Sequence, residues 1–135
     1  MDGVPEPFID AEDIADVAAA ALTEDGHANR RYEVTGPRLL TFAEAVEEIA
    51  RASGRPVRFV PVPLDEFAAS MARQGVPEDV AALMTSLVTE VLDGRTARVA
   101  DGVRRALGRE PRDFRDYARA AAATGVWTPA VAVGR

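Results

Sequence analysis

The sequence predicts a mostly helical α/β domain, with one βαβ unit of two or three short parallel strands and five to six helices. Two segments rich in β-branched and aromatic residues, 31–35 and 57–62, flank a helical pattern. Strand, helix and strand within about thirty residues is typical of a right-handed βαβ unit. Elsewhere the apolar residues recur at the three- and four-residue spacing of amphipathic helices.

The first helix is expected to begin after Asp10, which suits an N-cap position, with Asp13 as an acidic capping partner. Residues 1–7 precede it as a turn, because their two prolines disfavour helix. An apolar face at i, i+3, i+4 and i+7 follows, and Gly26 ends the polar stretch after the helix.

The βαβ unit comes next. Residues 31–35 form its first predicted strand. The spacing of Thr41 and Glu44 predicts a capping box at the start of the helix, and Gly54 suits its left-handed C-cap. Residues 57–62 form the second strand, which should run parallel to the first.

The rest of the chain is predicted to be helical. Four more helices are predicted, between Pro63 and Gly75, between Pro77 and Gly94, between Asp101 and Gly108, and between Phe114 and Gly125. Pro77 is expected at the first helical position of the second of these, and Asp101 as the N-cap of the third. We therefore expect a single domain over residues 1–135, with a disordered tail at 128–135.

Composition excludes several function classes. The net charge of −6 argues against a nucleic-acid or anionic-membrane surface, and no apolar run approaches the length of a membrane span. The chain has no cysteine, which predicts a cytoplasmic protein without disulfides. All 16 basic residues are arginine, so Schiff-base lysines and Tyr-x-x-x-Lys pairs are excluded; this arginine and alanine usage indicates a GC-rich, bacterial source.

Three blocks of sequence resemble the carboxyl-terminal half of NmrA-like proteins, which are atypical short-chain dehydrogenase/reductases. These blocks are residues 8–17, 32–47 and 101–111 followed by Phe114. The resemblance implies a truncated Rossmann-like remnant, in which residues 8–62 carry the edge of a nucleotide-binding sheet and residues 63–127 form a helical substrate-binding lobe. Proteins of this family reduce small molecules with NAD(P)H or sense the nucleotide without turning it over.

The glycine-rich loop of that family has no counterpart here. None of the ten glycines forms a G-x-G-x-x-G cluster, and each is interpreted as a turn or a helix stop. We therefore expect no NAD(P) binding by this chain alone, unless a partner supplies the loop. A homodimer through the exposed sheet edge and helices is the favoured partner, and a separate Rossmann-half chain is the alternative.

Candidate catalytic residues are Asp10, Asp13 and Tyr32, although helix capping and solvation are the favoured explanation of the two acids, and packing is the favoured role of the tyrosine. His27 is interpreted as a solvated loop residue, and one histidine without cysteine makes a metal site improbable. The family's helical lobe implies an apolar pocket, with the hydrophobic core as the alternative role for its residues. The candidate pocket residues are Phe8, Phe67, Met71, Met84, Leu87, Val91 and Trp127. The arginines at 104, 105, 109 and 112 suit either an anionic ligand or a solvated face.

Three functions follow from these observations. The first is a module that binds a hydrophobic small molecule without redox activity. The second is half of a split NAD(P)H-dependent reductase, completed by a separate chain. The third is a cofactor-independent cyclase, isomerase or lyase that acts on a hydrophobic natural product through a carboxylate or a tyrosine.

Overall fold

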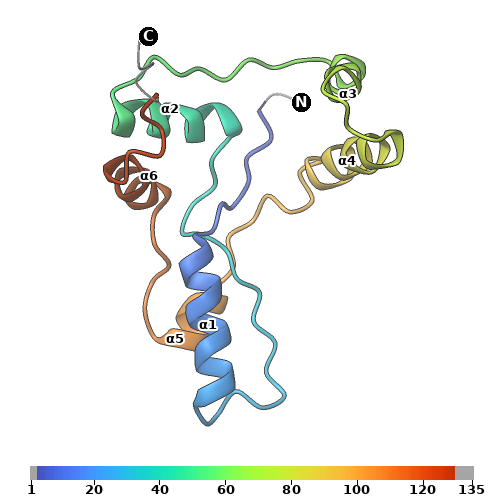
Figure 1. Cartoon of the computed structure of the whole chain (residues 1–135). Coiled ribbons are helices and arrows are strands. Elements are labelled where there is room, and N and C mark those ends of the chain that lie inside the picture. The colour runs from blue at the N-terminus through green and yellow to red at the C-terminus, as the bar shows by residue number, and fades with distance from the viewer. Residues whose placement is uncertain (1–2, 130–135) are drawn as a thin grey trace.

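The computed structural model describes residues 3–129 and contains six α-helices in that range (Figure 1). Their number and order agree with the helices expected from the sequence. In chain order the helices are α1 (Ala11–Thr23), α2 (Phe42–Ser53), α3 (Leu64–Arg73), α4 (Glu78–Val91), α5 (Gly102–Leu107) and α6 (Phe114–Ala123). The predicted tail falls mostly on residues 130–135, which lie outside the described range.

The helices pack in three separate pairs. Helix α1 lies against α5, α2 against α6, and α3 against α4, and within residues 3–129 no other two helices are in contact. Figure 1 shows the α3–α4 pair at a distance from the other two pairs, joined to them by long extended segments. The chain therefore has no single layer that gathers all six helices around one core.

Most of the predicted helix boundaries are confirmed. The Asp10 side chain accepts a hydrogen bond from the Glu12 backbone N–H at 2.9 Å and caps α1. The Thr41–Glu44 capping box at α2 is present in both directions. Gly54 adopts the predicted left-handed C-cap conformation, with φ of 66°.

Three predictions about helix ends are wrong. Asp13 caps nothing, because its carboxylate is turned inward and binds arginine. Asp101 precedes α5 but makes no side-chain capping bond. Pro77 is the N-cap of α4 and not its first helical residue, so α4 begins one residue later than predicted.

The predicted βαβ unit is wrong for the part of the chain that the structure describes. Residues 31–35 and 57–62 are extended but belong to no strand ladder, and the only β-bridge described joins Glu6 to Leu40. A strand needs a neighbour to receive its backbone hydrogen bonds. The Glu33 carbonyl instead accepts a hydrogen bond from the Gly102 backbone N–H, at the start of α5, at 3.0 Å.

The buried apolar core is small. Among residues 3–129, seven apolar residues are buried, four of them alanines: Val17, Ala20, Leu40, Ala45, Ala81, Val103 and Ala118. The chain exposes 9434 Å² of surface. A compact monomer of 14.4 kDa exposes about 6,800 Å². Much of the surface that folding normally buries therefore stays accessible.

The apolar face of α4 contributes to this surface. Leu83 is 55% exposed, and Leu87 and Val91 are 44% and 46% exposed, so these residues do not form the core that the helical pattern suggested. Only Ala81 of this helix is buried, and α3 buries none of its residues. No helix in the described range has both the length and the apolar character needed to cross a membrane.

Candidate functional site

An apolar cleft of about 870 Å³ lies between the start of α1 and one face of α6. This volume is within the range of small-molecule sites, about 300–1,000 Å³. Its residues come from both ends of the chain. They are Phe8, Ile9, Asp10, Ala11, Glu12, Arg112, Phe114, Asp116, Tyr117, Ala120, Ala121 and Thr124.

An aromatic cluster forms one wall of the cleft. The ring of Phe8 packs edge-on between Phe42 and Phe114, at centroid distances of 5.3 and 5.4 Å. Phe114 in turn packs against Tyr117, one turn along α6, at 5.6 Å. Tyr117 is 42% exposed and lines the cleft, so part of its surface is accessible to a ligand.

Gly36 positions this wall. A Cβ atom at Gly36 would lie 1.8 Å from the Phe8 carbonyl oxygen, so only glycine allows the two backbones to approach this closely. The Gly36 N–H donates to the Pro7 carbonyl at 3.3 Å. Gly36 is therefore more than the turn residue that the sequence suggested. It allows its own segment to lie directly against the backbone of Pro7 and Phe8.

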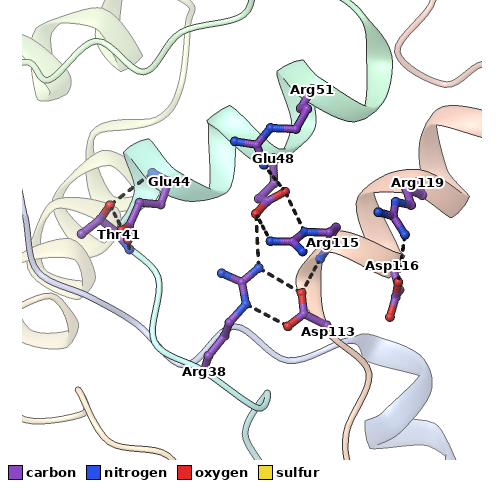
Figure 2. Close-up of polar contacts among 9 residues, drawn as sticks. All are labelled: Arg38, Thr41, Glu44, Glu48, Arg51, Asp113, Arg115, Asp116 and Arg119. Atoms are coloured by element: carbon purple, nitrogen blue, oxygen red, sulfur yellow. Dashed lines mark hydrogen bonds and ion pairs between the residues drawn. The ribbon is translucent and has the colours of Figure 1, made fainter.

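Helix α6, which carries the Phe114 and Tyr117 rings of this wall, is fixed by a charged network shown in Figure 2. Arg38 donates two hydrogen bonds to Asp113, the N-cap of α6, at 2.8 and 2.9 Å. Arg38 lowers the pKa of Asp113 to about 2. The buried carboxylate of Glu48 on α2 receives Arg51 at 2.8 Å and Arg115 at 3.3 Å, and the Arg115 hydrogen bond lowers its pKa.

A second charged group lies behind the start of α1. The fully buried carboxylate of Asp13 accepts the Arg112 backbone N–H at 2.7 Å, and it also pairs with the side chains of Arg109, at 2.8 Å, and Arg112. Asp16 binds the same two guanidinium groups, that of Arg109 at 2.6 Å and that of Arg112 at 3.1 Å. Both hydrogen bonds lower the pKa of Asp16, and the bond from Arg112 has the larger effect. This group joins α1 to the segment between α5 and α6.

The structure brings together only some of the residues predicted for a site. Phe8 and Asp10 line the cleft. Asp13 is enclosed by arginine, and Tyr32 lies in a different hollow with His27. The ring centroids of Trp127 and Tyr117 are 6.3 Å apart, but Trp127 lines a third hollow beside the end of α6. The predicted pocket residues on α3 and α4 do not line the cleft: Phe67, Met71, Met84, Leu87 and Val91.

Sequence reasoning did not assign Phe114 and Tyr117 to the site, although their spacing on a helix was visible. The signal that was overlooked is the pair of aromatic residues three apart directly after Asp113, at the first turn of a capped helix. The interpretation of His27 as a solvated loop residue was wrong, because its side chain is only 10% exposed and bonds Tyr32.

The residues described do not fit a dinucleotide. Pyrophosphate is bound by free N–H groups at a helix N-terminus beside closely spaced glycines. Here the side chains of Asp10, Thr41 and Asp113 occupy the N-termini of α1, α2 and α6, and each of these helices has an acidic first turn. Within residues 3–129, no three acidic, histidine or cysteine side chains are placed to hold a metal ion.

No family model matches this chain, but known proteins are similar to it in sequence. It is 42% identical over 116 residues to an NAD(P)H azoreductase of Xenophilus azovorans, a match that covers 86% of this chain and 41% of the relative. It is 41% identical over 123 residues to an uncharacterized oxidoreductase of Bacillus subtilis, with 90% and 43% covered. This chain is homologous to part of an NAD(P)H azoreductase and to part of a second oxidoreductase.

Solved structures agree on the fold. The triphenylmethane reductase of Citrobacter sp. superposes with a TM-score of 0.73 at 23% identity, over 88% of this chain and 41% of that one. An NADPH-dependent quinone oxidoreductase from Escherichia coli gives 0.73 at 21% identity, over 87% and 41%. The chain therefore spans about two fifths of the length of the relatives that it matches.

Proposed function

We propose that this chain forms the substrate-binding portion of an NAD(P)H-dependent oxidoreductase, of the NmrA-like kind, and that its apolar cleft takes a planar aromatic or quinonoid molecule. The observation that carries the proposal is the cleft of about 870 Å³ with the rings of Phe8, Phe114 and Tyr117 on it. The names of the relatives support a conjugated, ring-containing substrate, since azo compounds, triphenylmethane dyes and quinones are all conjugated molecules.

The nucleotide is bound, in this proposal, by protein outside residues 3–129. Two observations support this division. The N-termini of α1, α2 and α6 are capped by side chains and have acidic first turns, so they would repel a pyrophosphate. The chain also exposes 9434 Å² of surface, which leaves a large area for the nucleotide-binding portion to cover.

The chain's own residues then bind and orient the substrate. NAD(P)H supplies a hydride when it is bound. The aromatic wall excludes water from one face of a flat substrate and stacks against it, and such contacts are worth about 0.5–1.5 kcal/mol per ring pair beyond burial. The charged network around Glu48 and Asp113 keeps α6 in place, and with it the Tyr117 ring.

Calorimetric titration of the 135-residue chain with menadione, a flat quinone, tests the proposal. We expect saturable binding that Tyr117→Ala weakens at least about fivefold, since Tyr117 lines the cleft and is 42% exposed. Leu22→Ala is the control, because Leu22 is 86% exposed on α1 and does not line the cleft. Circular dichroism checks that both variants keep the helices.

NADPH titrated into the same sample gives the second readout. We expect no saturable heat and no oxidation of NADPH by this chain alone. Equal affinity for menadione in Tyr117→Ala and the unmodified chain would refute the assignment of the cleft. Saturable NADPH binding would refute the division of labour and leave the cleft assignment to be judged on the menadione result alone.

A further inference from the structure

A second hollow, of about 280 Å³, lies on the side of the molecule formed by α5 and the loop after α1. It shares no residue with the apolar cleft, and its lining is polar. The residues around it are Gly26, His27, Arg30, Tyr32 and Arg105. None of these five was needed for the proposed substrate site.

The close approach of Gly102 builds one side of this hollow. A Cβ atom at Gly102 would lie 2.1 Å from the Glu33 carbonyl oxygen, so the start of α5 is pressed against the extended segment that carries Tyr32. Arg105 stands three residues later, on the same face of α5. Its guanidinium carbon therefore comes to lie 5.8 Å from the centre of the Tyr32 ring, over its face.

The loop after α1 builds the other side. Asn29 has φ of 59°, a left-handed conformation that asparagine tolerates, and the Arg30 N–H donates to the His27 carbonyl at 3.1 Å. This turn directs Arg30 back toward His27. The His27 Nδ1 atom lies 2.8 Å from the Tyr32 hydroxyl, and its Nε2 atom lies 3.9 Å from a Glu24 carboxylate oxygen.

The charge of the hollow is unbalanced. Nine arginines in the described part of the chain pair with a carboxylate, at positions 38, 51, 95, 98, 104, 109, 112, 115 and 119. Arg30 and Arg105 form no such pair within residues 3–129, and no acidic residue lines the hollow. Two arginines, an imidazole and a phenol thus converge in a chain whose net charge is −6.

We propose that this hollow binds a phosphoryl group, either as inorganic phosphate or as a phosphomonoester. Guanidinium groups present paired N–H donors that match phosphate oxygens, and two of them supply the charge that a dianion requires. The hydroxyl of Tyr32 is held in place by His27 and adds a third donor when the imidazole donates to it. The site does not depend on the substrate cleft.

The single histidine makes the test direct, because the chain gives one set of imidazole NMR signals, all from His27. Sodium phosphate is titrated into the protein at fixed pH, with ionic strength held constant by sodium chloride. We expect a saturable change in the imidazole ring signals. Arg30→Gln and Arg105→Gln should each weaken binding at least about tenfold, because each removes a charged hydrogen-bond donor.

Arg73→Gln is the matched control, since Arg73 is an exposed arginine on α3 that does not line the hollow. Its affinity for phosphate should equal that of the unmodified chain. Phenyl phosphate, titrated in the same way, separates the two sources: tighter binding than phosphate indicates an organic phosphomonoester, and equal binding indicates the free ion. An unsaturable change, or equal affinity in all three variants, would overturn the proposal.

Discussion

Removal of the Asp13 carboxylate gives the most direct test of how this structure is held together. The side chain is fully buried and receives the Arg112 backbone N–H at 2.7 Å, together with the guanidinium groups of Arg109 and Arg112. It joins α1 to the segment that leads into α6. If this group fixes one end of the cleft, its loss should cost far more than the loss of a surface ion pair.

The magnitude follows from burial. Loss of one partner of a buried ion pair costs about 3–5 kcal/mol. Arg109 and Arg112 are 38% and 41% exposed, and they can turn toward water when the carboxylate is removed. We therefore expect Asp13→Ala to lower the free energy of unfolding by about 2–3 kcal/mol, because it still leaves the Arg112 N–H without its acceptor. Asp13→Asn keeps one acceptor oxygen and should cost less, about 1–2 kcal/mol.

Urea unfolding measures the effect, followed by the fluorescence of Trp127 and by circular dichroism. For a slope of about 1.5 kcal/mol per molar urea, Asp13→Ala should lower the midpoint by more than about 1 M. Asp16→Asn is the control, because Asp16 binds the same arginines but is 43% exposed, and its midpoint should move far less. Equal urea midpoints for Asp13→Ala and Asp16→Asn would refute the reasoning from burial.

Three further predictions concern other elements. The depressed pKa of Asp113, about 2, stabilises the fold above pH 4 and loses this effect as pH falls from 4 to 2, so unfolding midpoints over that range should fall less in Asp113→Asn. Gly102→Ala should lower the melting temperature by several degrees, because its Cβ would lie 2.1 Å from the Glu33 carbonyl oxygen. The isolated chain should form a dimer through α4, and Leu83→Glu with Leu87→Glu should reduce its native mass to that of a monomer.

Much of the helical structure could be predicted from local chemistry. Caps and stops act within a few residues, so Asp10, the Thr41–Glu44 box and Gly54 were sufficient to place helix ends. The strands could not be predicted in the same way, because a β-branched segment becomes a strand only when another strand receives its hydrogen bonds. Within the described range, residues 57–62 have no such neighbour.

The site was less predictable than the helices. Asp10 and Phe8 were found because they are close to each other in the sequence and to a helix start. Tyr117 belongs to the same cleft but lies more than a hundred residues away, and only the folded chain brings the two regions together. The burial of Asp13 also depends on a distant partner, Arg112, and nothing in its local acidic context distinguishes it from a solvated capping residue.

Under the proposed function, the unpaired extended segments and the large exposed surface would share one physical explanation. Val57, Val60 and Val62 are 40%, 59% and 42% exposed on a segment whose composition suits a buried strand. Each helix pair covers part of its own apolar surface, but no sheet joins the three pairs in the described residues. A nucleotide-binding portion that pairs with residues 57–62 would supply both the missing hydrogen bonds and the missing cover. The same contact would bring a nucleotide to a chain in which the N-termini of α1, α2 and α6 are already capped by side chains.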